Sequence, residues 1–277
     1  MDITELSKQY DFTGKTVVLT GGTGVLGREM ASGLVGLGAK VAVLDRNTEI
    51  PEDYQTKVEA GPGKYLVVSG DVLDRSRLED ARELIVSAFG QINCLINAAG
   101  GNHPAATTKP EQVFSDLPED ALQFTLDLNL LGTILPCQVF GKEMIKHQSG
   151  SIVNITSMAA ERPLTRIPAY AAAKAGVSNF TRWLAVHMAQ EYSPEIRVNA
   201  LAPGFFLTSQ NRFLLMEEDE KTLTARGRQI ISHTPLARFG MPEDLLGTLF
   251  WLLSDASRFV TGIIVPVDGG FSAYSGV

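Results

Sequence analysis

Short apolar runs alternate with longer amphipathic segments from one end of the chain to the other. The apolar runs are rich in β-branched residues, and most are followed directly by glycine, serine, asparagine or aspartate, as is typical of buried strands. They cover residues 15–20, 40–44, 64–69, 92–96, 151–156, 196–201 and 262–267. Helical periodicity is clearest over 75–89, 118–147 and 168–192. This alternation without a linker predicts one α/β domain over residues 1–277, a doubly wound parallel sheet of about seven strands with helices on both faces.

Residues 205–234 depart from this pattern. They follow the strand over 196–201 but are polar, charged and only partly helical. A segment of this length beyond a strand end is a candidate for a lid that closes over a substrate.

A glycine-rich turn, Gly21-Gly-Thr-Gly-Val-Leu-Gly27, joins the first strand to a helix. Its glycines let the backbone approach a pyrophosphate, whose charge the helix N-terminus stabilises. The next strand ends in Asp45, about 20 residues further on, where a carboxylate can accept hydrogen bonds from ribose hydroxyls and repel a 2′-phosphate. The spacing therefore predicts a Rossmann fold that binds NAD rather than NADP. Arg46 keeps NADP open, and a plain turn cap is the alternative role for Asp45.

Ser157 follows the strand over 151–156, and Tyr170 and Lys174 stand four residues apart in a helical run. That spacing places the phenol and the ammonium on one helix face. A nearby cation favours the phenolate, so Tyr170 is a candidate general acid/base, and the Ser157 hydroxyl can stabilise charge on a substrate oxygen. The alternative for the pair is a surface aromatic beside a solvated lysine.

Composition narrows the choice of partners. The chain has 24 Lys and Arg against 31 Asp and Glu, a net charge of −7, and no basic run, which argues against nucleic acid. No apolar run approaches the ~18 residues of a membrane span, and residues 1–12 lack the pattern of a secretory signal. We therefore expect a cytoplasmic protein with no membrane partner. Cys94 and Cys137 lie in apolar patterns and are predicted to be core thiols, with no disulfide and no metal site.

An ordered set of motifs identifies this sequence as similar to the short-chain dehydrogenase/reductase family over residues 12–271. The set comprises Thr20-Gly21 with Gly24 and Gly27, Asp45, Asp71, Asn97-Ala-Ala-Gly100, Asn129, Ser157, Tyr170-Ala-Ala-Ala-Lys174, Pro203-Gly204 and Asp268-Gly-Gly270. One position departs from the usual pattern, because Val25 stands where the middle glycine of the turn is expected, and Gly24 takes that role one residue earlier.

The resemblance implies a four-residue catalytic site. Tyr170 would be the acid/base, Lys174 would lower its pKa and hold the nicotinamide ribose, and Ser157 would orient the substrate carbonyl. Asn129 would hold a water between Lys174 and solvent. The residues expected to bind the cofactor are Gly21, Thr23, Gly24, Val25, Leu26, Asp45, Arg46, Asp71, Val72, Asn97, Ala98, Ala99, Gly100, Tyr170, Lys174, Pro203, Gly204, Phe206 and Thr208.

Within the family, three segments resemble the bacterial D-mannonate oxidoreductases, also called fructuronate reductases. They are Gly100-Gly-Asn-His-Pro104, Arg162-Pro-Leu-Thr-Arg166 and Pro203-Gly-Phe-Phe-Leu-Thr-Ser-Gln-Asn-Arg212. The resemblance implies hydride transfer between nicotinamide and a sugar acid, in a homotetramer. Another sugar, polyol or gluconate dehydrogenase and a 3-oxoacyl thioester reductase are the enzyme alternatives, and a dinucleotide-sensing scaffold protein is the non-enzyme one.

A sugar acid brings a carboxylate, which arginine binds best because its planar fork holds both oxygens. Arg162, Arg166, Arg212 and Arg238 lie in segments that can face the cleft, and Arg212 is the first choice. The predicted substrate residues are Asn102, His103, Ser157, Arg162, Asn211 and Arg212. For His103, a loop residue bonded to backbone is an equal alternative.

Overall fold

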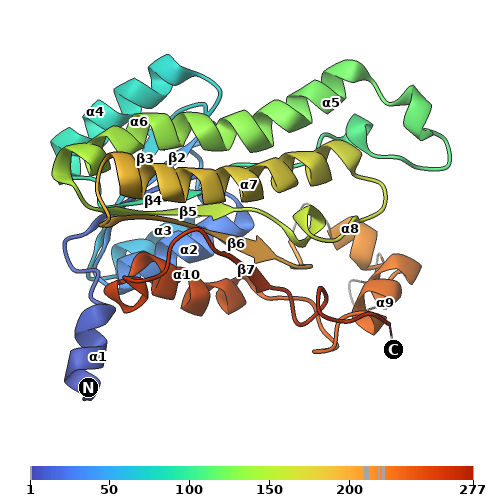
Figure 1. The fold of residues 1–277 in the computed structure, drawn as a ribbon. Helices are drawn as coiled ribbons and strands as arrows, with labels where there is room; N and C mark the ends of the chain where they lie inside the picture. The colour runs from blue at the N-terminus through green and yellow to red at the C-terminus, as the bar shows by residue number, and fades with distance from the viewer. Residues whose placement is uncertain (1, 209–211, 218, 220–221, 277) are drawn as a thin grey trace.

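In the computed structural model, which describes residues 2–208, 212–217, 219 and 222–276, seven strands form one sheet. They are β1 (Thr16–Thr20), β2 (Lys40–Asp45), β3 (Lys64–Ser69), β4 (Cys94–Asn97), β5 (Gly150–Ile155), β6 (Ile196–Pro203) and β7 (Ile264–Val267). Their order is β3-β2-β1-β4-β5-β6-β7, and every neighbouring pair is parallel (Figure 1). The predicted doubly wound sheet is confirmed, and each strand overlaps its predicted apolar run.

Helices cover both faces of the sheet (Figure 1). They are α1 (Ile3–Gln9), α2 (Val25–Gly36), α3 (Glu52–Glu59), α4 (Arg75–Phe89), α5 (Glu119–Leu126), α6 (Gly132–His147), α7 (Pro168–Glu191), α8 (Arg212–Leu215), α9 (Ala225–Ser232) and α10 (Leu246–Leu253). The face that carries α4, α6 and α7 buries Phe140 and Met144, and the face that carries α2, α3 and α10 buries Leu34 and Leu249. No helix in the described part of the protein is long and apolar enough to cross a membrane.

The order of the strands reverses between β1 and β4, and the two strand ends meet closely there. A Cβ on Gly21, whose φ is +69°, would lie 2.7 Å from the Ala99 backbone. The buried Thr20 hydroxyl accepts hydrogen bonds from the backbone N–H groups of Ala98 and Ala99, both at 3.2 Å. A crevice at such a reversal is where open parallel sheets bind ligands.

The predicted helix over 118–147 is present but contains a π-helical turn, Asp127–Leu131, between α5 and α6. The N–H of Gly132 donates to the carbonyl of Asp127, five residues earlier. Asn129 lies in this turn and is fully buried. Such turns concentrate at functional sites.

Two helices were not predicted from the apolar pattern. In α1, Asp2 and Glu5 cap each other's backbone N–H groups, and no residue of the helix is buried. In α3 only Tyr54 and Val58 are buried. Both helices lack the wide apolar stripe on which periodicity depends.

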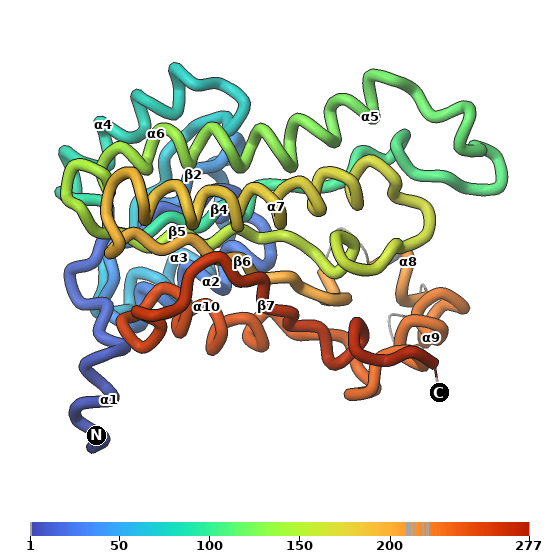
Figure 2. The backbone as a smooth tube through the Cα atoms, viewed as in Figure 1, coloured from blue at the N-terminus to red at the C-terminus, as the bar shows by residue number. Residues whose placement is uncertain are grey.

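The segment proposed as a lid contains α8 and α9, which pack together beyond the strand ends. The connection from β4 to α5 extends past the sheet on the same side (Figure 2). Backbone hydrogen bonds from Leu207 to Gly240 and from Gly240 to Phe205 close the base of the segment.

Candidate active site

The glycine-rich turn folds tightly over the start of α2. Gly24 is the N-cap of this helix, which has no side-chain cap, and Val25 is its first residue. A Cβ on Gly27 would lie 2.5 Å from the Gly21 carbonyl oxygen, so the turn requires glycine at both ends. The helix therefore presents uncapped N–H groups beside a bare backbone, an arrangement that suits an anionic pyrophosphate. Leu26 packs against the core below it.

Asp45, at the end of β2, is tied to the glycine-rich turn. Its Oδ2 accepts hydrogen bonds from the hydroxyl and the N–H of Thr23, at 2.7 and 3.2 Å. Its Oδ1 has only a longer contact, 3.4 Å, from the N–H of Asn47. An ionised carboxylate has about four acceptor sites, so Asp45 keeps capacity for ribose hydroxyls while it positions the turn.

A shallow cavity opens beside Asp45, at the ends of β2 and β3. Its walls include Arg46 and Asp71, and the exposed Arg77 contributes a second guanidinium. Asp71 accepts a hydrogen bond from the N–H of Leu73, and Val72 is buried against Gly132. Arg46 and Asp71, both predicted to bind the cofactor, thus line the same cavity.

The four residues Asn97 to Gly100, at the end of β4, lie against the glycine-rich turn at the strand reversal. Asn97 is buried and donates from its amide to Asn154 Oδ1 at 2.8 Å and to Cys137 Sγ at 3.1 Å. Gly100 lies between Asn129 and Lys174, since a Cβ there would be 2.7 Å from Asn129 Oδ1 and 3.2 Å from Lys174 Nζ. Cys94 and Cys137 are free and buried, as predicted.

Ser157 and Tyr170 are partly buried, and the Ser157 side chain is close enough to affect the pKa of the Tyr170 phenol. The Ser157 hydroxyl also accepts the N–H of Ala159 at 3.1 Å, which fixes its direction at the end of β5. Burial raises the pKa of Tyr170 above its usual value, and the Ser157 hydroxyl acts in the opposite direction. The phenol is therefore a proton donor at neutral pH.

Lys174 is buried one helical turn beyond Tyr170. Its ammonium donates to the carbonyl of Ile155 at 2.8 Å and lies 5.7 Å from the centre of the Tyr170 ring. Burial lowers the pKa of Lys174 to about 8. The spacing predicts that Lys174 lowers the pKa of Tyr170; in this structure burial raises that pKa, and the opposing effect comes from Ser157.

Asn129 is held rigidly by backbone groups. Its amide donates to the carbonyls of Gly101 and Thr125, at 2.7 and 2.8 Å, and its Oδ1 accepts the N–H of Gly101 at 3.2 Å. The structure thus brings Asn129, Lys174, Tyr170 and Ser157 together around the end of β5. The water relay through Asn129 stays a prediction.

Asn102 and His103 form a wall that continues from β4. The Asn102 amide donates to Thr107 Oγ1 at 2.7 Å, whereas its buried Oδ1 has no donor among the described residues. His103 Nδ1 accepts the N–H of Ala105, and its ring packs edge-on against Phe124. The backbone role weighed for His103 is therefore present, while contact of either residue with substrate stays a prediction.

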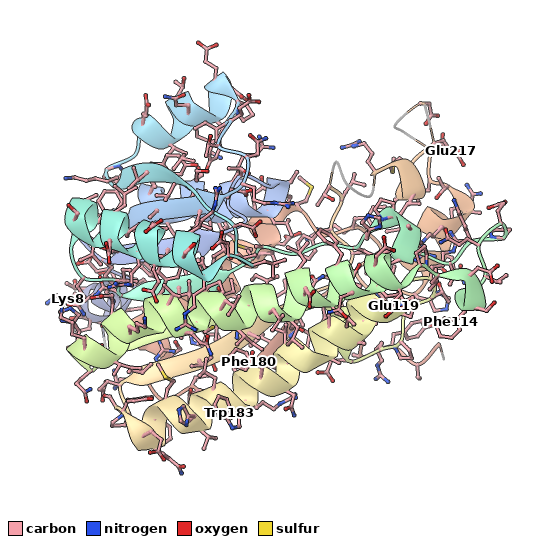
Figure 3. All side chains as sticks on the ribbon, turned by 90° about the horizontal axis from the view of Figure 1, so that it is seen from above. Lys8, Phe114, Glu119, Phe180, Trp183 and Glu217 are labelled. Atoms are coloured by element: carbon pink, nitrogen blue, oxygen red, sulfur yellow. The ribbon has the colours of Figure 1, made fainter. Side chains whose placement is uncertain are left out.

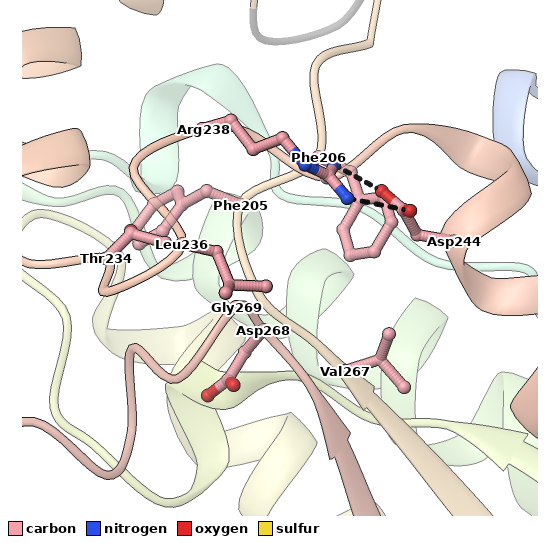
Figure 4. Close-up of a pocket in the computed structure, with 10 residues that line it drawn as sticks. Phe205, Phe206, Thr234, Leu236, Arg238, Asp244, Val267, Asp268 and Gly269 are labelled. Atoms are coloured by element: carbon pink, nitrogen blue, oxygen red, sulfur yellow. Dashed lines mark hydrogen bonds and ion pairs between the residues drawn. The ribbon is translucent and has the colours of Figure 1, made fainter.

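Arg162 and Arg238, two of the candidate arginines, bind other groups of the protein. Arg162 donates to the Ser272 carbonyl from Nε and Nη2, at 3.1 and 2.8 Å, and so holds the C-terminal segment. Arg238 forms a two-fold ion pair with Asp244, with Nη2 and Oδ1 2.9 Å apart (Figure 4). Arg212 begins α8, and its N–H donates to the Thr208 carbonyl. Asn211 lies outside the described residues.

The loop after β6 connects the crevice to the proposed lid. Pro203 ends the strand, and the N–H of Gly204 donates to the carbonyl of Val267. The Phe206 side chain is buried against Gly240 and lines a separate cavity of about 230 Å³ (Figure 4), so a cofactor contact of this residue would come from its backbone.

Comparison with known proteins identifies the class. The sequence model of the short chain dehydrogenase family matches residues 15–219, so the protein belongs to the short-chain dehydrogenase/reductase family and is an oxidoreductase of that family.

Three similar proteins bear on the kind of reaction and substrate. An uncharacterized oxidoreductase UxuB of Bacillus subtilis is 50% identical, over 96% of this chain and 98% of the relative. A crystal structure described as that of a D-mannonate oxidoreductase from Haemophilus influenza, with bound NAD, is 41% identical with a TM-score of 0.90, over 98% of this chain and 100% of the other. The 2-dehydro-3-deoxy-D-gluconate 5-dehydrogenase of Dickeya dadantii is 31% identical, over 95% of this chain and 98% of the relative.

Burial of the Lys174 ammonium costs stability, which gives a testable prediction. The pKa of Lys174 falls from 10.5 to about 8 on folding. Between these values the unfolded protein binds more protons, so wild-type stability rises with pH there. We expect Lys174→Met to raise the unfolding free energy at pH 7 by about 1–3 kcal/mol, a gain that shrinks as the pH approaches 10.

Urea unfolding of the cofactor-free protein at pH 7 and pH 9.5 measures this difference. Lys57→Met, a change at an exposed lysine, is the control and should show no comparable gain. A destabilised Lys174→Met at pH 7 would show that the hydrogen bond to Ile155 outweighs the cost of burying the charge.

Proposed function

We propose that this protein is an NAD-dependent oxidoreductase that transfers a hydride between nicotinamide and a sugar acid, with D-fructuronate and D-mannonate as the substrate pair. The observation that carries the proposal is the convergence of Ser157, Tyr170 and Lys174 beside a glycine-rich turn at the strand reversal. A proton donor, a hydroxyl that binds oxygen and a dinucleotide cradle thus border one crevice.

The residues of the crevice suit NAD. The uncapped start of α2 and the close-packed Gly21 and Gly27 favour a pyrophosphate, and Asp45 keeps acceptor capacity for the ribose. Arg46 and Arg77 are the residues that would favour a 2′-phosphate instead. The similarity to a structure with bound NAD supports the choice of NAD. When bound, NAD supplies hydride acceptance and, as NADH, hydride donation.

The protein's own residues transfer the proton and stabilise the negative charge that develops on the substrate oxygen. During reduction, the Ser157 hydroxyl donates a hydrogen bond to the substrate carbonyl oxygen and orients it. Tyr170 gives its phenolic proton to this oxygen as negative charge develops there. Lys174 stabilises the resulting phenolate and holds the ribose, and Asn129 positions a water that returns the proton from solvent. In oxidation the same proton passes from the alcohol to Tyr170.

The choice of a sugar acid as substrate rests on the similarity to two proteins and on the polar walls of the site. One relative acts on a keto sugar acid by its name, and one similar structure is described as a D-mannonate oxidoreductase. The wall formed by Asn102 and His103 carries polar groups, which suits a substrate with several hydroxyls. A 3-oxoacyl thioester reductase would favour a more apolar wall and NADP, whereas a sensing scaffold would not need the Tyr170 and Lys174 pair.

A homotetramer is part of the proposal, with α5, α6, α7 and the C-terminal segment at the contacts. Trp183 and Val186 on the outer side of α7 are 57% and 56% exposed. Phe180 stacks on Trp183 along this surface (Figure 3). Exposed apolar side chains gathered on one helix face favour association with a second copy of the protein.

The direct test is a substrate panel of hexuronates, aldonates, polyols and acyl thioesters, each assayed with NAD(H) and NADP(H). We expect the highest kcat/KM for D-fructuronate with NADH, measured by the loss of nicotinamide absorbance. Preference for a polyol or an acyl thioester would select one of the alternatives, and no turnover with any substrate would favour the sensing role.

Replacing the proton donor separates chemistry from binding. We expect Tyr170→Phe to leave the Kd for NAD within about two-fold and to lower kcat by ~100-fold or more, because the ring stays and only the donor is lost. Tyr10→Phe, a change in a loop outside the crevice, is the matched control. Residual turnover near the wild-type level would remove Tyr170 from the mechanism.

Cofactor choice depends on the carboxylate at the end of β2. Asp45→Ser removes a ribose acceptor and a negative charge, so we expect kcat/KM to fall ~10-fold or more with NADH and to rise with NADPH. Thr23→Val serves as the control, since it removes the 2.7 Å hydrogen bond to Asp45 but keeps the charge. A wild-type enzyme that already prefers NADPH would show that Arg46 dominates.

A further inference from the structure

Arg166 and Arg226 are brought into the same neighbourhood by the fold, and neither has an acidic partner among the described residues, in contrast to Arg238 with Asp244. Arg166 was one of the four arginines considered from the sequence. Arg226 was not, because it lies in a polar helical segment, Ala225-Arg-Gly-Arg, that gives no sign of which arginine faces inward.

Arg226 is the second residue of α9 and is held in a defined position. Thr224 caps the helix by accepting the N–H of Gly227 at 3.0 Å, and Gly227 packs against the backbone of Leu215 in α8. The Arg226 side chain is partly buried, and its Nη1 lies 3.4 Å from the Thr165 hydroxyl. The guanidinium therefore reaches from the proposed lid to the segment between Ser157 and Tyr170.

Arg166 follows Thr165 directly and lies four residues before Tyr170. Its φ is +79°, a left-handed conformation that is uncommon for a residue with a side chain. Its carbonyl accepts the N–H of Thr108 at 2.9 Å. Three segments therefore meet at this point: the connection after β4, the start of α7 and the lid helix α9.

The Arg226 guanidinium contacts Thr165, the residue next to Arg166, so the two positive charges lie in the same neighbourhood. Burial lowers the pKa of Arg226, and the charge of Arg166 lowers it further. Arginine nevertheless stays charged at all ordinary pH values, so the pair is a double positive charge with no carboxylate partner among the described residues; the Arg226 side chain is partly buried and that of Arg166 is exposed. An anion between the two groups would relieve the repulsion and accept their N–H donors.

We propose that Arg226 and Arg166 together bind the carboxylate of the substrate, with Arg226 as the residue that makes the enzyme specific for acids over neutral sugars. This inference rests on the proposed function. It places the substrate carboxylate where the proposed lid meets the active site. Arg162 is not part of this site, because it holds the C-terminal segment. Arg226, on helix α9 of the proposed lid, would form an ion pair with an acid but not with a neutral sugar.

The test uses substrates that differ only in the charged group. D-Mannonate and D-mannitol differ by a carboxylate against a hydroxymethyl group, as do D-fructuronate and D-fructose. We expect Arg226→Leu to raise KM for D-mannonate and D-fructuronate 10-fold to 100-fold and to change kcat/KM for the neutral sugars less than three-fold. Arg166→Leu should act in the same direction, and Arg226→Lys should fall between, because it keeps the charge but loses the fork.

Arg228→Leu is the matched control, since it removes one positive charge from an exposed position on the same helix, where the arginine contacts only the Leu223 carbonyl among the described residues. It should leave the ratio of acid to neutral activity unchanged. Equal losses of acid activity in Arg226→Leu and Arg228→Leu, or an unchanged ratio in Arg226→Leu, would overturn the clamp. If Arg226→Leu no longer folds, as judged by NAD binding, Arg226→Gln carries the test.

A binding measurement separates this inference from the proposed function. Calorimetry with D-mannonate and D-mannitol, on protein saturated with NADH, reads the carboxylate preference without turnover. Wild-type protein that turns over no sugar acid would refute the proposed function. Binding of D-mannonate that is lost in Arg226→Leu would still support the clamp, and binding that is unchanged in Arg226→Leu would refute it.

Discussion

The site depends on the burial of one ammonium group. Lys174 is buried at the end of β5, where its charge is stabilised by a carbonyl at the strand end. The Thr156 hydroxyl donates to the Lys174 carbonyl at 2.9 Å and lies 2.8 Å from Ser178 Oγ, which fixes the helix against the strand. Because β5 also leads into Ser157, this contact sets the distance between the hydroxyl and the phenol. A rigid sheet thus positions groups that belong to two separate segments.

The sheet and much of the crevice were predictable because their causes are local. Buried parallel strands appear in the sequence as continuous apolar runs. The turn over Gly21–Gly27 needs glycine because other residues would clash with the backbone, and the sequence shows the glycines directly. The position of Asp45 follows from counting along one βαβ unit. The side chains that converge from distant segments were predicted through family resemblance, since a spacing of four residues alone says nothing about burial.

What the sequence could not predict arises from long-range contacts. Periodicity missed α1, which depends on its cap, and α3, which buries only two side chains. The sequence favoured Arg212 among the candidate arginines, but all of them lie in polar segments, and their partners cannot be seen there. The structure separates them by their partners, a backbone carbonyl for Arg162 and a carboxylate for Arg238. The pKa of Tyr170 likewise depends on burial that no spacing reveals.

The π-helical turn at Asp127–Leu131 affects how α5 and α6 pack against their neighbouring helices. Such a turn holds one residue more than an α-helical turn, so the faces of α5 and α6 are out of register with each other. This change of phase lets α5 pack on α7 while α6 packs on α4. The extra residue of the π-helical turn therefore both points Asn129 inward and separates the packing surface of α5 from that of α6. Deletion of one residue here would join α5 and α6 in one phase and displace the Asn129 side chain together with a layer of the core.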